Sequence, residues 1–282
     1  MSALTLRKRL AGAAAIAAAS LLLAACSSSA PESTSTNAGA SDVADLGTIK
    51  VGALATPAGD ILKFISDNLA ADAGLKIEYT EFTDYNTPNS ALADGSIDAN
   101  LFQNATFLKT FNEASGSDLV SEGEIYLPTA AFYSDKVKSL DDLKDGATIA
   151  IPNDPTNEGR ALKILAAEKQ ITTTDAPTVL SDITKNPHDF KFTEIENASL
   201  PQAVADSDAA FVTLSFALPA GLSSDQAILV EGTDSPYYNV LATTPKLKDD
   251  PRVQKLKELL LDPKTVAYIN DTWGGLVVPA EG

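Results

Sequence analysis

The 282-residue sequence contains few of the side chains on which most protein chemistry depends: one cysteine, one histidine, one methionine and one tryptophan. A single cysteine excludes an intramolecular disulfide, and one Cys with one His cannot form a Cys/His metal site. The single histidine, His188, lies in a loop-like Asn-Pro-His run, and neither Gly-x-Ser-x-Gly nor Gly-x-Gly-x-x-Gly occurs. We therefore expect no metal, no cofactor and no hydrolase or oxidoreductase activity; the protein is not expected to be an enzyme.

Basic residues are also scarce, with 21 Lys and Arg against 38 Asp and Glu, for a net charge of -17 at pH 7. Binding to nucleic acid depends on cations that neutralise phosphates, so this charge argues against a nucleic-acid partner. Hydrophobic residues make up 44% and charged residues 21% of the chain, which is typical of a globular protein. The length allows one large or two modest domains.

The N-terminal residues 1–25 have the features of a secretory signal peptide. Residues 7–9 are basic, and residues 10–25 form an apolar, alanine-rich segment that is short for a membrane span. The sequence Leu-Ala-Ala before Cys26 resembles a bacterial lipobox, so we predict that Cys26 is lipidated and carries palmitate. A signal peptide followed by an incidental cysteine is the alternative. Residues 26–46 are rich in Ser, Thr, Ala and Gly, which predicts a flexible tether after the lipidated cysteine.

Strands and helices alternate from residue 48 onwards, which predicts an α/β protein built from parallel βαβ units. The predicted strands cover residues 49–54, 76–82, 97–102, 125–133, 148–151, 191–195, 209–212, 227–230 and 237–243. The predicted helices cover residues 60–71, 88–95, 107–111, 139–143, 157–169, 200–205, 216–222, 250–261 and 263–273.

Two segments of the chain are alike. Residues 90–99 and 202–210 each have the pattern of a short helix, an Asp-small turn and a second Asp before a strand. This repetition predicts two lobes of like topology that deliver strand ends to a shared cleft, where open α/β sheets bind their ligands. Chance similarity of two helix–strand turns is the alternative.

Residues 149–162 have the pattern of a strand end, a sharp turn and a new helix. Pro152 and Pro155 prevent ladder or helix bonding in the turn, and residues that favour helix N-caps surround them. Helix N-termini attract anions, and the planar guanidinium of Arg160 suits a carboxylate. We therefore predict that the helix start and Arg160 hold the carboxylate of a small molecule. The alternative is an ordinary turn with a surface salt bridge.

Residues 147–162, with the sequence Ala-Thr-Ile-Ala-Ile-Pro-Asn-Asp-Pro-Thr-Asn-Glu-Gly-Arg-Ala-Leu, resemble a signature of the NlpA family of methionine-binding lipoproteins. Residues 82–89, 91–100 and 234–241 match further motifs of this family, in order, and the resemblance extends over residues 48–280. It implies an α/β, two-lobed periplasmic-binding-protein-like fold. Each lobe is expected to be a mainly parallel sheet flanked by helices, and two crossover strands are expected to join the lobes.

The resemblance places residues 47–134 and 236–282 in lobe I, and residues 138–232 in lobe II. It also assigns roles to single residues. Arg160 binds the ligand carboxylate, and Asn239 binds the amino or carboxylate end.

The resemblance further implies that Tyr85 and Phe102 pack on the ligand side chain and that Tyr133 supports them. Without it, an aromatic residue at a strand end fits a core position equally well, and Asn239 fits the capping of a turn.

Two positions depart from the family pattern: Asn104 stands where His is usual, and Thr213 stands where Asn is usual. Both positions are expected to face the ligand. Asn104 keeps its hydrogen-bonding capacity without an imidazole face, whereas Thr213 lacks an amide. Because buried polar groups reject ligands that leave them unpaired, the ligand is expected to be a small amino acid or its derivative, with methionine not assured.

The resemblance implies a monomeric, lipid-anchored solute-binding protein on the extracytoplasmic side of the cell membrane. It would deliver methionine or a related amino acid to an ABC permease with its ATPase subunits, and the lobes would close on the ligand. An adhesive or scaffold lipoprotein with an altered pocket is the alternative.

Overall fold

The computed structural model describes residues 44–281, which belong to one compact unit. The predicted signal peptide, the lipidation site Cys26 and the tether up to residue 43 lie outside the described residues. Within residues 44–281, every helix is too short or too polar to cross a membrane.

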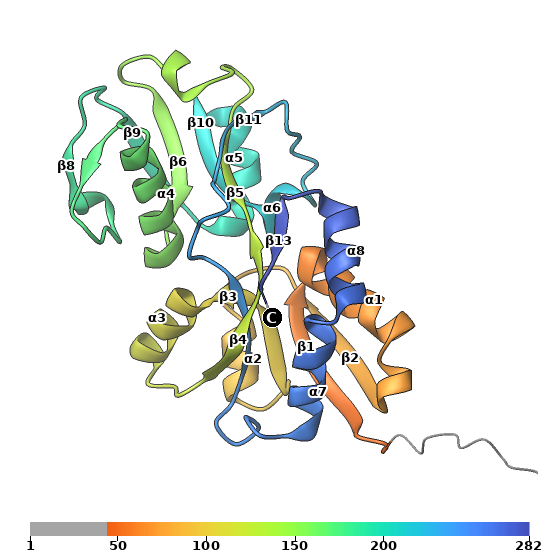
Figure 1. The fold of residues 1–282 in the computed structure, drawn as a ribbon. Helices are drawn as coiled ribbons and strands as arrows, with labels where there is room; N and C mark the ends of the chain where they lie inside the picture. Colours follow the sequence, from red (N-terminus) through yellow and green to blue (C-terminus); the bar gives the residue numbers. More distant parts are fainter. Residues whose placement is uncertain (1–43, 282) are drawn as a thin grey trace, which may run out of the picture. The chain divides into compact units, whose positions relative to one another are not determined.

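The first sheet has six strands in the order β13-β4-β12-β3-β1-β2 (Figure 1). The strands are β1 (Gly47–Leu54), β2 (Leu75–Phe82), β3 (Ala99–Asn104), β4 (Val120–Pro128), β12 (Asn239–Thr243) and β13 (Val277–Pro279). The surrounding helices are α1 (Asp60–Asn68), α2 (Pro88–Ala93), α3 (Ala105–Ser115), α7 (Pro251–Leu260) and α8 (Pro263–Trp273). We call this sheet with its helices lobe I.

The second sheet has five strands in the order β11-β5-β10-β6-β9. The strands are β5 (Ala130–Tyr133), β6 (Thr148–Pro152), β9 (Lys191–Ile195), β10 (Ala209–Thr213) and β11 (Ala227–Val230). The elements beside it are α4 (Pro155–Ala167), α5 (Leu200–Asp206), α6 (Leu214–Ala217) and the small hairpin of β7 (Thr172–Thr173) and β8 (Ile183–Lys185). We call this sheet with α4 and α5 lobe II.

The α/β, two-lobed architecture is as predicted, but both sheets are mixed rather than mainly parallel. In lobe I, β1 is parallel to β2 and β3, whereas β12 is antiparallel to β3 and β4. In lobe II, β6 is parallel to β9 and β10, whereas β5 is antiparallel to β10 and β11. The reason is the double crossover, because β5 and β12 begin at the lobe boundary and must run against the strands that end there.

The two sheets share a core topology. The order β2-β1-β3 in lobe I corresponds in chain order and direction to β9-β6-β10 in lobe II, and an antiparallel strand, β12 or β5, lies beside the third strand in each sheet. Asp98 accepts a hydrogen bond from the Lys50 N–H of β1 at 2.9 Å, and Asp208 accepts one from the Thr148 N–H of β6 at 2.8 Å. The two like turns found in the sequence therefore tie equivalent strands together in the two lobes.

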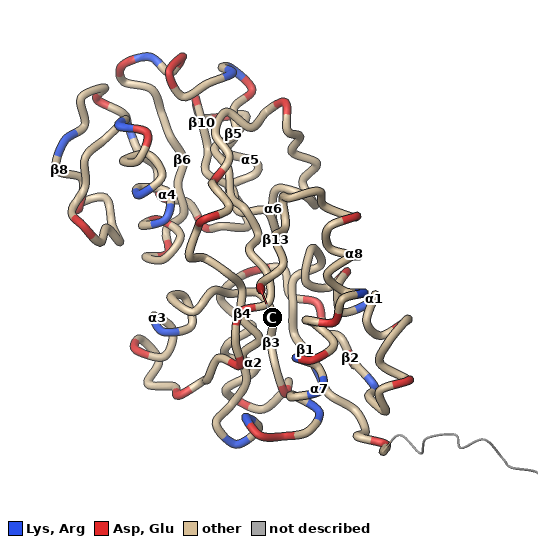
Figure 2. Tube along the Cα trace, viewed as in Figure 1, with Lys and Arg blue, Asp and Glu red and all other residues tan. Residues whose placement is uncertain are grey.

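Each lobe has hydrophobic cores on both faces of its sheet, and the core on the α5 face of lobe II extends between the lobes to Leu54 and Phe102. In lobe I, α1 buries Ile61, Leu62 and Ile65 completely, and its polar face stays in water, as its apolar spacing predicts. Acidic and basic residues are interspersed along the helices and outer loops of both lobes (Figure 2).

Three strands were not predicted from the sequence: β7 and β8, which form a hairpin, and β13, which follows the last helix. These strands have two or three residues, too few for a periodic pattern. β5, which falls within the predicted range of lobe I, is hydrogen-bonded into the second sheet. The exact lobe boundaries stay a prediction.

Candidate functional site

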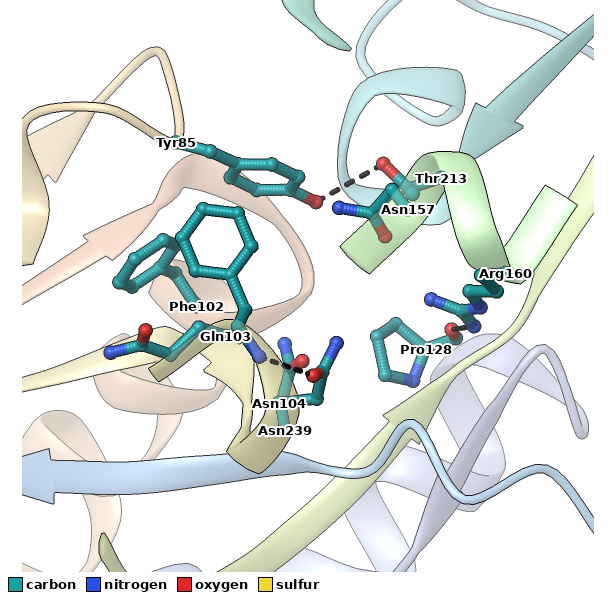
Figure 3. Close-up of a pocket in the computed structure, with 10 residues that line it drawn as sticks. Tyr85, Phe102, Gln103, Asn104, Pro128, Asn157, Arg160, Thr213 and Asn239 are labelled. Carbon is teal, nitrogen blue, oxygen red and sulfur yellow. Dashed lines mark hydrogen bonds between the residues drawn. The ribbon is translucent and has the colours of Figure 1, made fainter. Parts of the chain in front are cut away.

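A pocket lies where strands from both lobes end (Figure 3). Lobe I and the adjoining crossover contribute Tyr85, Phe102, Gln103, Asn104, Phe107, Pro128 and Asn239, and lobe II contributes Asn157, Arg160 and Thr213. Its free volume is only about 10 Å³, which is room for about one water molecule. The lobes are thus close together around this pocket, and a larger ligand can enter only if they separate.

Six of the seven site residues predicted from the sequence line this pocket: Tyr85, Phe102, Asn104, Arg160, Thr213 and Asn239. The seventh, Tyr133 on β5, is buried in the apolar cluster between the lobes and is not part of the lining. Sequence reasoning missed four lining residues: Gln103, Phe107, Pro128 and Asn157. The structure brings the predicted residues together, and their part in binding stays a prediction.

Arg160 enters the pocket from α4 with most of its guanidinium already engaged. Its Nε donates to Oε1 of Glu231 at 2.8 Å, and its Nη2 donates to Oε2 of Glu231 and to the Pro128 carbonyl. The Tyr237 ring lies 4.7 Å from the guanidinium carbon. Of the three guanidinium nitrogens, Nη1 alone has no hydrogen-bond partner within residues 44–281. Arg160 therefore offers the pocket one nitrogen rather than the planar fork that the sequence suggested.

The N-terminus of α4 is not an open anion site, contrary to our expectation. Asp154 is the N-cap, and its Oδ1 accepts hydrogen bonds from the N–H groups of Thr156 at 3.1 Å and Asn157 at 2.9 Å. The protein's own carboxylate thus occupies the place that we predicted for a ligand carboxylate. The sequence offered several capping residue types in this turn and could not show which of them caps.

Three asparagines acquire defined orientations from their hydrogen bonds. Oδ1 of Asn104 accepts from the Phe107 N–H at 2.9 Å, as the N-cap of α3, which leaves its Nδ2 as a donor. Nδ2 of Asn239 donates to the Tyr126 hydroxyl at 3.3 Å, and Nδ2 of Asn157 donates to Asp154 at 3.1 Å. Asn239 and Asn157 therefore keep Oδ1 as an acceptor.

A hydrogen bond crosses the pocket between the lobes. The hydroxyl groups of Tyr85 and Thr213 are 3.1 Å apart (Figure 3). Burial raises the pKa of Tyr85 above its usual value, and the Thr213 hydrogen bond opposes this only in part, so the hydroxyl is protonated at neutral pH. The Tyr85 ring also contacts Phe102, Phe107 and Phe216, with ring centroids 4.8–5.9 Å apart. These rings form an apolar wall beside the polar groups.

Gln103 belongs to a different network. Its amide bonds to Asn89 and Asn100, and all three side chains are buried beneath the end of β3. Of the ten described residues that line the pocket, only Arg160 carries a charge. The part of the chain that the structure describes contains no group of three or more His, Cys, Asp or Glu arranged to hold a metal ion.

Two bacterial lipoproteins are similar in sequence to this chain over most of its length. It is 35% identical to the D-methionine-binding lipoprotein MetQ of Salmonella typhi, over 83% of this chain and 89% of the relative. It is also 35% identical to lipoprotein 28 of Escherichia coli K12, over 82% of this chain and 87% of the relative.

Solved structures share the fold as well. A nutrient-binding protein from Burkholderia cenocepacia bound to methionine is 36% identical, with a TM-score of 0.80 over 83% of this chain and 100% of that chain. A periplasmic substrate-binding protein of an ABC transporter from Coxiella burnetii is 38% identical, with a TM-score of 0.79 over 82% of this chain and 100% of that chain. The NlpA lipoprotein family matches residues 49–281, so the predicted resemblance is confirmed and the chain belongs to this family.

Proposed function

We propose that this protein captures a zwitterionic amino acid, methionine or a close relative, between its lobes and delivers it to an ABC importer. The observation that carries the proposal is that the pocket contains both hydrogen-bond donors and hydrogen-bond acceptors that its own residues leave available. Arg160 Nη1 and Asn104 Nδ2 are donors that suit a carboxylate, whereas Asn239 Oδ1 and Asn157 Oδ1 are acceptors that suit an ammonium group. An α-amino acid carries both groups on one carbon.

The aromatic wall supports a ligand with an apolar side chain. Phe102 and Phe107 lie edge to face with centroids 5.8 Å apart, and Tyr85 lies against both. A thioether makes favourable contacts with aromatic rings, and burial of such a side chain favours the closed form. The relatives named above that bind methionine or D-methionine agree with this choice.

Capture would require the lobes to open, admit the ligand and close again. The ligand would contact both lobes in the closed form only, so binding would shift the population towards closure. The closed protein would then dock on a permease, whose ATPase subunits would drive transport. We further propose that Cys26 carries the lipid anchor, that the domain works on the extracytoplasmic side of the membrane, and that it acts as a monomer.

Isothermal titration of the purified protein with L-methionine, D-methionine and the other amino acids tests the proposal. We expect saturable 1:1 binding of at least one form of methionine or of an amino acid with a similar apolar side chain. Unfolding and refolding the protein first removes any ligand retained from the cell. The absence of binding to every amino acid at millimolar concentration would contradict the proposal and favour an adhesive or scaffold lipoprotein.

A further inference from the structure

Glu231 does not line the pocket, but its carboxylate is bonded both to Arg160 and to the two crossovers between the lobes. It follows β11 at the start of the second crossover, and its Oε2 accepts from the Ala130 N–H on the first crossover at 3.1 Å. Its Oε1 accepts from the Ser235 hydroxyl at 2.7 Å and from Nε of Arg160 on α4 at 2.8 Å. One carboxylate thus connects α4 to both crossovers.

The ion pair is sealed from water, because the side chains of Arg160 and Glu231 are only 3% and 5% exposed. Charges in such surroundings are weakly screened, so the field of Arg160 in the pocket depends on Glu231. Two charged residues on either side of Arg160 along the chain, Asp154 and Lys163, are respectively hydrogen-bonded and in solvent. Asp154 is bonded to the N–H groups at the start of α4, and Lys163 is exposed, with its Nζ 5.9 Å from the centre of the Tyr237 ring.

We propose that Glu231 is a positioning residue that sets the charge preference of the pocket. It holds the guanidinium by two nitrogens, leaves Nη1 for the ligand, and cancels the positive charge of Arg160. A pocket that is neutral overall favours a ligand that is neutral overall, which for an amino acid is the zwitterion. This inference deepens the proposed function and depends on amino-acid binding at this pocket.

The physical argument concerns the ligand's ammonium group. An α-ammonium lies next to the carboxylate that Nη1 would bind, so it must lie within a few ångströms of the guanidinium. Without Glu231, Arg160 would repel this ammonium while it attracted the carboxylate more strongly. The same pocket would then favour an anion that lacks the ammonium group.

The test compares three probes by isothermal titration: L-methionine, 4-(methylthio)butanoate, which lacks the amino group, and L-methioninamide, which lacks the carboxylate. The wild-type protein should prefer methionine to both analogues. In Glu231→Gln, the ratio of affinities for methionine and 4-(methylthio)butanoate should shift towards the acid by roughly ten- to hundredfold. This is the order expected for one unit charge about 6 Å away at an effective dielectric constant of about 20. Methioninamide should bind more weakly than to wild type.

A second variant keeps the test decisive if Glu231→Gln does not fold. Ser235→Asp adds a negative charge beside Glu231 at a half-buried position, and it should shift the same ratio towards methionine by about twofold or more. Ser235→Asn is its uncharged control. Glu168→Gln removes an exposed carboxylate just beyond the C-terminus of α4 and serves as the control for Glu231→Gln.

The outcomes separate the two proposals. If wild-type protein binds no amino acid, the proposed function fails and this inference fails with it. If wild-type protein binds methionine but both charge variants keep the wild-type ratio, only the role of Glu231 is overturned. Opposite shifts in Glu231→Gln and Ser235→Asp, with unchanged ratios in the two controls, would support it, because a purely structural role would weaken all three probes alike.

Discussion

Arg160 and Glu231 form an ion pair that is removed from water. Both side chains are almost completely buried, and the loss of one partner of such a pair leaves an uncompensated charge. We expect Arg160→Ala to lower the free energy of unfolding by about 3–5 kcal/mol and to abolish amino-acid binding. Urea denaturation and isothermal titration measure the two effects.

A paired substitution separates stability from binding in this prediction. Arg160→Met combined with Glu231→Gln leaves no unpaired charge, so it should recover most of the lost stability and still fail to bind. If Arg160→Ala binds its ligand as tightly as wild type does, Arg160 has no part in recognition.

Asn239 presents an acceptor that we assign to the ligand ammonium. Asn239→Leu keeps a similar volume but removes Oδ1 from the pocket, and it should weaken methionine binding by roughly ten- to hundredfold, the range for one hydrogen bond to a charged group. Titration with methionine and with 4-(methylthio)butanoate measures the effect. The acid has no ammonium to lose, so equal losses for both probes would contradict the assignment.

Site residues that are marked by a pattern among their neighbours in the sequence could be predicted, whereas residues that act through distant parts of the chain could not. Arg160 stands out because a strand end, a turn and a helix start precede it within a dozen residues. Glu231 is 71 residues further along the chain, and no pattern connects the two. Asn157 looked like one of several capping residues, and only the position of Asp154 shows that Asp154 caps while Asn157 faces the pocket.

At the scale of elements, the first turn of α4 contains a buried carboxyl group, that of Glu158, which is unfavourable for stability when it is charged. Glu158 is 1% exposed, and its Oε1 has no hydrogen-bond partner within residues 44–281. Burial, and then the neighbouring Glu194, raise the pKa of Glu158 to about 7. A carboxyl whose pKa is raised on folding destabilises the protein once it ionises, so stability should fall as pH rises from about 4.5 to 7.

We therefore expect Glu158→Gln to stabilise the protein at pH 8 by roughly 1–3 kcal/mol and to have little effect at pH 4.5. Urea denaturation at the two pH values measures the difference. The exposed Glu168→Gln on the other end of the same helix should leave the pH dependence unchanged. A gain of the same size at both pH values would show that ionisation of Glu158 is not the cause.

Helix starts were easier to predict than strand directions. Asp154, Asp250 and Asp262 each precede a proline and cap α4, α7 and α8, which is a signal confined to a few residues. The direction of β5 and β12 depends on where the chain crosses between lobes, and alternating hydrophobicity contains no information about direction. The mainly parallel sheets expected from the βαβ pattern were therefore wrong only where a crossover intervenes.

At the scale of the whole molecule, polar contacts join the lobes near the pocket in addition to the apolar side chains buried between them. One is the hydrogen bond between Tyr85 and Thr213, and another is a 3.5 Å approach of the Thr110 and Thr156 hydroxyls between α3 and α4. Because these contacts require closed lobes, we expect them to set how often the ligand-free protein opens.

Tyr85→Phe tests this expectation, since it keeps the aromatic ring and removes one hydrogen bond of about 1 kcal/mol. The open population of the ligand-free protein should rise by roughly fivefold, which small-angle scattering or a fluorescence pair across the lobes can detect. Tyr79→Phe, which alters a hydroxyl within lobe I, is the control. An unchanged open population would mean that other forces hold the lobes together.

Thr129 is the one residue between β4 and β5, and both its N–H and its hydroxyl donate to the carbonyl of Leu276, at 3.0 and 2.9 Å. Thr129 lies in the first crossover, which is therefore stabilised by the segment that leads into β13, almost 150 residues further along the chain. During synthesis, all the residues that line the pocket are added before Leu276, which completes this contact. Until then, the first crossover of a growing chain would lack this support, and its lobes would be free to move further apart.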